Sequence, residues 1–250
     1  MKRLGHSILL GAEEPLAMDR LLNFSSPVLF GVRDPVRFME LMDEAKNLVS
    51  PGFYLGDNFF AWSRNLSMFE DSVFKRAWES NVISEDDHSK PWGRYIEACA
   101  AVHSAKLDGD FVFFGLGSGS SIATIIDYLG DNCAGHLFWA FGSCSEHAKR
   151  VALNNSRIKL INEASINSLK ENIPPRIAYL QINLEDASLL LDVLTTAFNK
   201  VVFGGVILVC NYEMAEHWRN HKALLDPWLR AKGYIAIPLP TGHGMVFKAH

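Results

Sequence analysis

The sequence predicts an α/β fold: a mostly parallel seven-stranded sheet with an antiparallel C-terminal hairpin and a helical N-terminal extension. Three observations predict it. From residue 109 onward, short apolar runs alternate with segments of helical period, which is typical of a parallel sheet with helices on both faces. The first run, 111–114, leads directly into a glycine-rich turn and a helical pattern. The last two runs, 234–238 and 244–247, are joined by a link too short for a crossover, so we expect them to pair antiparallel.

Helical patterns dominate the first part of the chain. Residues 1–30 mix glycine, proline and short apolar pieces, and they predict an arm with little structure of its own. Asp34 is expected to cap a helix whose first residue is Pro35. That helix extends to residue 48, and the other expected elements are helices at 58–64, 70–78 and 92–107 and a polar loop at 84–90. We therefore divide the chain into an N-terminal arm and helical lid, 1–107, and a ligand-binding domain, 108–250.

The second part of the chain alternates strand and helix. A turn is expected at Gly204 and Gly205, between a helix and the strand that follows it. The expected strands are 111–114, 136–141, 158–162, 177–183, 206–210, 234–238 and 244–247, and the expected helices are 122–129, 146–153, 165–172, 187–201 and 213–232. Because open sheets of this kind bind ligands at the carboxyl ends of their strands, we look for a site there.

The glycine turn within GDFVFFGLGSG is the strongest candidate for a ligand site. Gly115, Gly117 and Gly119 allow the backbone to approach a ligand closely, and the free N–H groups of the following helix are offered to that ligand. Ser120 or Ser121 is expected to cap this helix. Turns of this kind serve NAD, FAD and S-adenosylmethionine (SAM) sites, and others only close a tight corner. The turn alone therefore leaves its ligand open.

Composition argues against several classes of function. The formal net charge is −4 and no block of lysine and arginine occurs, which argues against a nucleic-acid partner. No apolar stretch approaches the length of a membrane span, and the N-terminus does not resemble a signal peptide. The four cysteines are far apart and form no C-x-x-C pair, as expected for reduced thiols. We therefore expect a cytoplasmic protein that binds neither nucleic acid nor membrane.

Several segments, collinear along residues 55–250, resemble one enzyme family. They are DNFFAWSRNLSM (57–68), FEDSVFKRAW (69–78), AKLDGDFVFFGLGSG (105–119), IAYLQINLEDASLLLDVL (177–194), VVFGGVILVCNY (201–212) and TGHGMVFK (241–248). Together they resemble the macrocin-O-methyltransferase-like family of class I SAM-dependent methyltransferases. The resemblance implies a Rossmann-like class I methyltransferase fold, with SAM as the cofactor of the second domain and a small molecule as the methyl acceptor.

The resemblance also implies which residues serve the site. The residues expected to bind the cofactor are Gly115, Gly117, Ser118, Gly119, Ser120, Ser143 and Asn183. The candidates for catalysis at family positions are Glu185 and Tyr212. His217, in the helix expected after them, is the best available base or else a surface helix residue. The lid segment would cover the cofactor with Trp62 and with its neighbours Arg64 and Asn65.

The chain departs from the family pattern at the acidic positions. Phe113 stands where the family has an acid in the strand before the glycines, and the second strand ends in FGS where an acid normally holds the ribose hydroxyls. Asn183, Cys210 and Asn211 replace acids around the family's magnesium ion, so that Glu185 alone keeps a carboxylate there. Since a hard cation prefers carboxylate oxygens, we expect no metal.

Three functions fit these observations. The first is methyl transfer to oxygen or nitrogen of a small metabolite, working by proximity and orientation. The coordinated loss of acids also fits a catalytically degenerate protein that acts as a partner or binding subunit. A retained glycine turn without a metal site fits a SAM-using enzyme with non-methylating chemistry as well. The N-terminal arm is a candidate for forming a homodimer.

Overall fold

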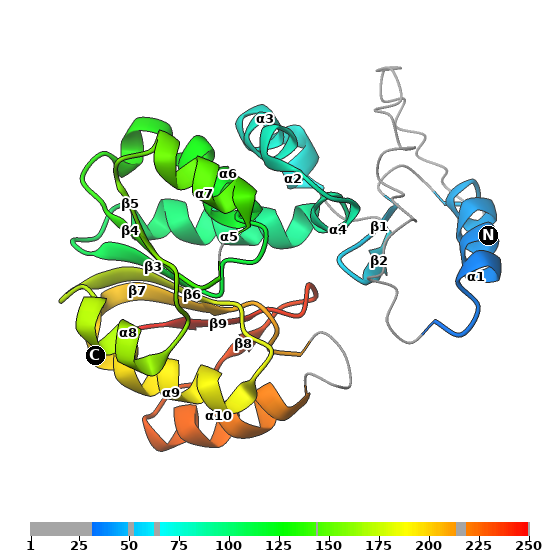
Figure 1. Ribbon diagram of the computed structural model, residues 1–250. Coiled ribbons are helices and arrows are strands. Elements are labelled where there is room, and N and C mark those ends of the chain that lie inside the picture. The colour runs from blue at the N-terminus through cyan, green and yellow to red at the C-terminus, as the bar shows by residue number, and fades with distance from the viewer. Residues whose placement is uncertain (1–31, 50–52, 63–65, 144, 214–218, 250) are drawn as a thin grey trace, which may run out of the picture.

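The computed structural model describes residues 32–49, 53–62, 66–143, 145–213 and 219–249 (Figure 1). Within these ranges, a seven-stranded sheet has the strand order β5-β4-β3-β6-β7-β9-β8. Its strands are β3 (Asp110–Phe114), β4 (Phe138–Phe141), β5 (Ile158–Ile161), β6 (Ile177–Ile182), β7 (Val201–Val209), β8 (Ile237–Pro238) and β9 (Gly244–Phe247). Neighbours pair in parallel from β5 to β7, whereas β9 runs antiparallel to both β7 and β8. The predicted fold class is confirmed.

Strands β3 and β6 lie at the centre of the sheet, where both of their faces are covered. All six residues of β6 are buried, as are the last four of β3. This is why β3 ends in a continuous apolar run and why β6 is apolar apart from Gln181, whose buried amide donates to the Ser121 hydroxyl. The chain goes from β3 outward to β4 and β5, then returns to β6 on the other side of β3. The strand order therefore reverses between β3 and β6, and such reversals are where open α/β sheets bind ligands.

Helices cover both faces of the sheet (Figure 1). One face carries α5 (Pro91–Ser104), α6 (Ser120–Leu129) and α7 (Glu146–Asn154), and the other carries α8 (Ile166–Asn172), α9 (Ala187–Ala197) and α10 (Arg219–Ala231). Each face has its own apolar core, with Phe111 and Tyr179 in the first and Leu180 and Leu194 in the second. In the ranges that the structure describes, no helix combines the length and the apolar character that crossing a membrane requires.

Short helices make up most of the N-terminal region: α1 (Pro35–Lys46), α2 (Ser67–Glu70), α3 (Ser72–Asn81) and α4 (Glu85–His88). As predicted, Asp34 caps α1, because its side chain accepts a hydrogen bond from the backbone N–H of Arg37 at 3.0 Å. The polar loop predicted at 84–90 is wrong, since α4 occupies most of it. The Ser84 hydroxyl caps α4 by accepting from the N–H of Asp87, and the acids that follow Ser84 suit the positive end of a helix.

The helix predicted at 58–64 is also wrong in the described residues. Strands β1 (Tyr54–Gly56) and β2 (Phe59–Ala61) form an antiparallel hairpin there. Asp57 and Asn58 make its two-residue turn with φ values of 48° and 59°, a left-handed conformation that Asp and Asn tolerate better than most residues. The rings of Tyr54 and Phe59 pack across the hairpin with their centroids 5.4 Å apart. Aromatic cross-strand packing therefore outweighs the helical pattern.

The path from α9 into β7 differs from the prediction. The helix expected at 187–201 ends at Ala197, a short 3₁₀ turn follows, and β7 then begins at Val201. Gly204 and Gly205 do not form a turn between elements. They lie inside β7, where the register with β6 shifts. Gly204 has a φ of 78°, and a Cβ on Gly205 would lie 2.8 Å from Val201, so the glycine pair marks a β-bulge.

Three further details differ from the sequence-based expectations: the cap of α6, the start of α10 and the length of β8. Helix α6 has Gly119 as its N-cap residue and no side-chain cap, so the expected capping by Ser120 or Ser121 is wrong. The helix expected from residue 213 starts at Arg219 within the described ranges, and Glu213 is not helical. Strand β8 is only two residues long, against five expected at 234–238.

Candidate functional site

The glycine turn after β3 has a backbone that side chains rarely adopt. Gly115, Gly117 and Gly119 have φ values of 89°, 53° and 85°. A Cβ on Gly115 would lie 1.9 Å from the backbone oxygen of Asn183, so this glycine is required where the chain passes the end of β6. A Cβ on Gly117 would have only Asn183 Nδ2 within 4 Å, at 3.8 Å. Gly117 therefore faces open space, which would allow a ligand to approach its backbone.

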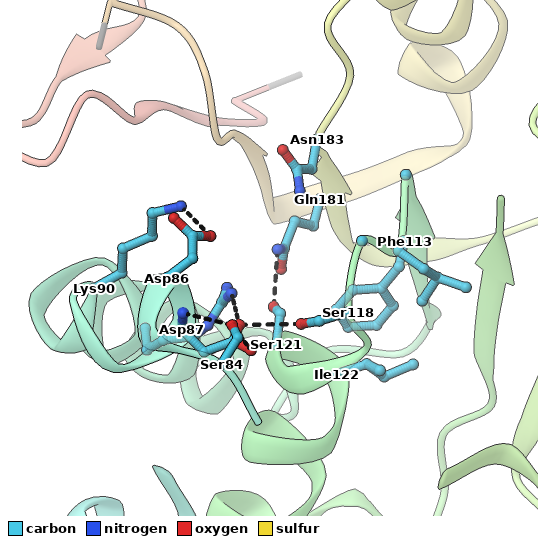
Figure 2. Close-up of a pocket in the computed structure, with 14 residues that line it drawn as sticks. Ser84, Asp86, Asp87, Lys90, Phe113, Ser118, Ser121, Ile122, Gln181 and Asn183 are labelled. Carbon is cyan, nitrogen blue, oxygen red and sulfur yellow. Dashed lines mark hydrogen bonds and ion pairs between the residues drawn. The ribbon is translucent and has the colours of Figure 1, made fainter. Parts of the chain in front are cut away.

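Two adjoining cavities lie at this turn. The larger, of about 460 Å³, extends from Gly142 and Ser143 after β4 to Glu185 and Asn211 after β6 and β7. The smaller, of about 130 Å³, lies between residues 84–90, hereafter the α4 segment, and the glycine turn (Figure 2). The residues that line both are Lys90, Gly115, Leu116, Gly117 and Asn183. The two cavities therefore meet over the glycine turn, at the point where the strand order reverses.

The residues expected to bind the cofactor divide between these cavities. Gly115, Gly117 and Asn183 line both. Ser118 lines the smaller cavity and Ser143 the larger one. The remaining two, Gly119 and Ser120, line neither: a Cβ on the former would clash with Ala148, and the buried hydroxyl of the latter has no partner among the described residues.

The residues expected to act in catalysis or in the lid are more scattered. Glu185 is exposed and lines the larger cavity. Tyr212 is buried, its hydroxyl donates to Asp226, and it lines neither cavity, so this geometry gives its predicted role no support. Trp62 is 55% exposed and stacks on the neighbouring Phe60. The other three, His217, Arg64 and Asn65, lie outside the described residues.

The amides at the expected metal position bind each other. Asn211 Nδ2 donates to Asn183 Oδ1 at 3.0 Å, and Cys210 beside them is buried. A magnesium ion prefers carboxylate and water oxygens in an octahedral arrangement. Here two neutral amides already satisfy part of each other's hydrogen-bonding capacity, and Glu185 is the one carboxylate of the group. The residues of this position therefore do not fit magnesium.

A buried ion pair on α5 lies next to the smaller cavity. Arg94 lines that cavity, and its Nη1 donates to both carboxylate oxygens of Glu97, at 2.8 and 2.7 Å. Burial alone would raise the pKa of Glu97, but the Arg94 guanidinium and His243 beside it lower this pKa to about 2. Glu97 is therefore ionised at neutral pH, and its charge is balanced inside the protein.

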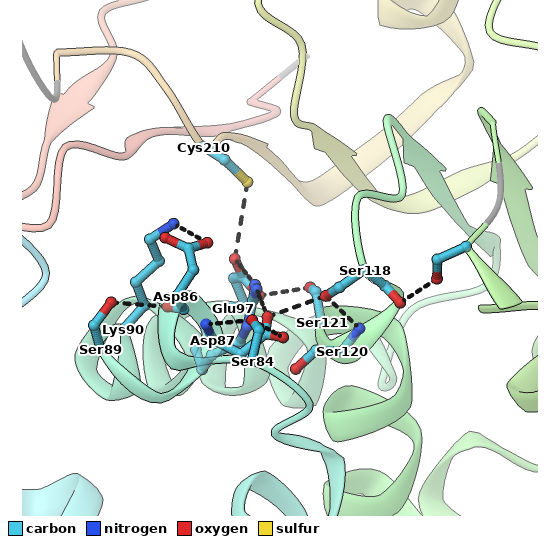
Figure 3. Close-up of polar contacts among 12 residues, drawn as sticks. Ser84, Asp86, Asp87, Ser89, Lys90, Glu97, Ser118, Ser120, Ser121 and Cys210 are labelled. Atoms are coloured by element: carbon cyan, nitrogen blue, oxygen red, sulfur yellow. Dashed lines mark hydrogen bonds and ion pairs between the residues drawn. The ribbon is translucent and has the colours of Figure 1, made fainter. Parts of the chain in front are cut away.

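His243 and Cys210 complete the surroundings of Glu97. Figure 3 shows Cys210 pointing toward it, with Sγ 3.9 Å from Oε1, and Nε2 of His243 lies 3.5 Å from the same oxygen. All three side chains are buried, with ligand atoms within 4.8 Å of one another, and zinc sites use these donor types. However, the Arg94 guanidinium already neutralises the carboxylate. Burial and the charge of Glu97 raise the pKa of Cys210, which keeps the thiol protonated. This is a hydrogen-bonded cluster built around an arginine.

The cluster is tied to the glycine turn by two serines (Figure 3). The Ser118 hydroxyl donates to Asp87 Oδ1 at 3.0 Å, and the Ser121 hydroxyl donates to Glu97 Oε2 at 2.6 Å. Arg94 lies between these acids, 3.5 Å from Asp87 Oδ1. Sequence reasoning placed both segments in the lid region and did not single out Asp87, Arg94 or Glu97. The available signal was the i,i+3 spacing of Arg94 and Glu97, which places them on one helix face.

The β1–β2 hairpin is attached to the start of α5 by a buried acid. Asp57 accepts hydrogen bonds from the backbone N–H groups of Trp92 and Gly93, at 3.1 and 2.8 Å, and from the Tyr54 hydroxyl. Asp57 therefore caps α5 from another element. Burial outweighs these hydrogen bonds and raises the pKa of Asp57. This contact holds the hairpin beside Lys90, which lines both cavities.

Comparison with known proteins agrees with the sheet topology. No protein-family model matches the chain, and no curated protein sequence matches it. Among solved structures, the O-methyltransferase NovP aligns with a TM-score of 0.57 and 14% identity, over 65% of this chain and 82% of NovP. The chain has the Rossmann-like fold of methyltransferases. CalS11, a TDP-rhamnose 3′-O-methyltransferase of calicheamicin biosynthesis, aligns with a TM-score of 0.53 and 13% identity, over 74% of this chain and 95% of CalS11. At such identities the likeness describes the fold, and the argument for an activity has to come from the site.

Proposed function

We propose that this protein is a SAM-dependent methyltransferase that methylates oxygen or nitrogen of a small metabolite without a magnesium ion. The observation that carries the proposal is the pair of cavities that meet over the glycine turn. The larger, about 460 Å³, is within the range of ~300–1,000 Å³ typical of small-molecule sites. The smaller, about 130 Å³, is similar to a cavity of ~150 Å³ that holds benzene, so it suits a ligand tail. SAM has a large nucleoside part and a small amino-acid part, which match the larger and the smaller cavity in relative size.

The charge beside the turn favours SAM over a dinucleotide. A glycine turn at a helix N-terminus would also suit a phosphate group. Here, however, Asp87 is buried against the turn and accepts from the Ser118 hydroxyl at 3.0 Å. Asp86 and Asp87 line the smaller cavity together with Lys90 and Arg94, so a phosphate there would meet two carboxylates as well as two cations. SAM carries no phosphate, and its sulfonium is positive. Gly115, Gly117, Ser143 and Asn183 would hold the cofactor, which supplies an electrophilic methyl group when bound.

The protein's own contribution is positioning. Among the residues that the structure describes, Glu185 is the one carboxylate lining the larger cavity, and it is exposed, so it can accept a proton from an acceptor or orient it. The hydrogen-bonded amides of Asn183 and Asn211 offer neutral donors and acceptors beside it. Such a site suits an acceptor that is already nucleophilic near neutral pH, such as an amine or an acidic hydroxyl.

A thermal-unfolding series tests the choice of cofactor. We expect SAM or S-adenosylhomocysteine at 100 times Kd to raise the Tm by about 5–10 °C, because ~2.7 kcal/mol of linkage is worth ~2–4 °C per kcal/mol in a chain of this size. NAD and ATP at the same concentration should leave the Tm unchanged. A larger shift with NAD than with SAM would reject the proposal.

Restoring acids tests the absence of magnesium from the site. In Asn183→Asp/Asn211→Asp, two carboxylates replace the amide pair beside Glu185, which gives magnesium three carboxylate ligands. We expect millimolar Mg²⁺ to raise the Tm of this double variant and to leave the wild-type Tm unchanged. A magnesium-dependent shift in the wild type, abolished by EDTA, would show that the present residues bind the ion after all.

A second function, a non-catalytic partner subunit, is favoured by one observation. The position after β4 that normally supplies a ribose-binding acid is lined by Gly142 and Ser143, which offer no charge. A charge-assisted hydrogen bond is worth ~1.5–3 kcal/mol, so its loss weakens cofactor binding. If none of the nucleosides above binds, this second function gains support and the first loses it.

A further inference from the structure

The smaller cavity is lined by balanced charge. Two cations, Lys90 and Arg94, and two acids, Asp86 and Asp87, line it. An anionic ligand such as a phosphate would meet both acids, and a simple cation would meet both basic groups. A zwitterion, with one charge of each sign a few ångströms apart, matches such a lining in both signs.

The four charged groups differ in how accessible they are. Arg94 and Asp87 have side chains 15% and 4% exposed, and they are occupied by Glu97 and Ser118. Lys90 and Asp86 have side chains 26% and 48% exposed. The accessible pair is therefore Lys90 with Asp86, and the buried pair forms the wall behind it.

Lys90 and Asp86 form an ion pair at the cavity, with Nζ and Oδ2 separated by 2.7 Å (Figure 2). The two residues are four apart in the chain, and Lys90 is the residue just before α5. A partly exposed pair of this kind contributes little to stability by itself. Each charge keeps unused hydrogen-bonding capacity, because an ammonium has three donors and a carboxylate about four acceptor sites. An α-amino-acid group can therefore bind alongside the pair in the opposite orientation.

We infer that the smaller cavity binds the amino-acid end of the cofactor, with Lys90 holding its α-carboxylate and Asp86 its α-ammonium. This inference rests on the proposed function. It adds Asp86 and Lys90, which the sequence places in a polar loop, to the ligand-binding residues. Lys90 lines the larger cavity as well as the smaller one. It therefore lies at the junction of the two cavities, where the amino-acid end of the ligand would join its nucleoside.

Calorimetric titration with two ligands tests this assignment. S-adenosylhomocysteine carries the amino-acid end, and 5′-methylthioadenosine is the same thionucleoside without it. We expect the wild type to bind the first at least tenfold more tightly. Lys90→Met and Asp86→Asn should each weaken S-adenosylhomocysteine about 10- to 100-fold, the range of a hydrogen bond to a charged group, and change 5′-methylthioadenosine less than about twofold.

Lys46→Met is the matched control, because Lys46 forms a comparable ion pair with Asp43 on α1, with 2.6 Å between Nζ and Oδ1. It should leave both affinities unchanged. Equal wild-type affinity for the two ligands, or an equal loss of both in Lys90→Met, would overturn the inference while nucleoside binding stands. If the wild type binds neither ligand, the proposed function itself fails.

Discussion

Replacing Gly117 by leucine is expected to abolish binding of SAM and S-adenosylhomocysteine while the protein stays folded. Gly117 lines both cavities, and a Cβ there would meet no atom nearer than Asn183 Nδ2 at 3.8 Å. A leucine side chain would therefore enter the space assigned to the ligand instead of clashing with the protein. The φ of Gly117 is 53°, in the left-handed region, so a residue with a Cβ at this position lowers the stability by about 1–2 kcal/mol.

Gly233→Leu is the control for this backbone cost. Gly233 also has a positive φ, of 81°, a Cβ there would have no atom within 4 Å, and it follows α10 and lines neither cavity. Both variants should lose similar stability in urea, and only Gly117→Leu should lose binding in a calorimetric titration. Wild-type affinity in Gly117→Leu would mean that the ligand does not lie over the turn.

Replacing Glu97 by glutamine is expected to lower the free energy of unfolding by about 3–5 kcal/mol, because the buried Arg94 guanidinium loses its nearer carboxylate partner and keeps only the more distant Asp87, at 3.5 Å. The Glu97 side chain is 3% exposed, and it also accepts from the Ser121 hydroxyl beside the glycine turn. The pKa of Glu97, about 2, is below its ordinary value near 4.5. Its contribution to stability is therefore present above about pH 4.5 and is lost as the pH falls toward 2.

The wild type should consequently lose stability between about pH 5 and 2, and Glu97→Gln should lose less over the same interval. Denaturant unfolding at a series of pH values measures both slopes. Glu146→Gln is a suitable control, because Glu146 forms an i,i+3 ion pair with Lys149 on the exposed surface of α7. It should follow the wild-type profile. Parallel pH profiles for the wild type and Glu97→Gln would show that the ion pair does not stabilise the fold.

The parts of the fold that the sequence predicts are those decided by local pattern. Strands β3 and β6 are buried on both faces, so both are predominantly apolar segments. The glycine turn is visible in the sequence because a Cβ on Gly115 would clash with the backbone oxygen of Asn183. The short link between β8 and β9 likewise allows only an antiparallel hairpin. In each case one physical requirement acts on neighbouring residues.

The parts that sequence reasoning missed depend on contacts between distant residues. The turn at Asp57 and Asn58 is stabilised by hydrogen bonds from Trp92 and Gly93, which no local pattern reveals. The α4 segment is attached to the glycine turn by the Ser118 hydroxyl, which donates to Asp87 at 3.0 Å. From the sequence alone, the polar residues of these segments predict solvent-exposed loops, because their hydrogen-bond partners lie far away in the chain.

The pairing at the expected metal position was also hidden. The sequence shows that Asn183 and Asn211 lack carboxylates, which predicts the loss of a magnesium site. It does not show that the two amides lie 3.0 Å apart and bind each other. That distance follows from the parallel pairing of β6 with β7, which brings their carboxyl ends to one edge of the sheet.

A crystal structure of the protein with S-adenosylhomocysteine tests the central claim most directly. We expect the thionucleoside in the larger cavity, between Ser143 and Asn183, and the amino-acid end in the smaller one beside Lys90. Ligand at another place, or both cavities empty at millimolar ligand, would contradict the claim that the glycine turn is a cofactor site.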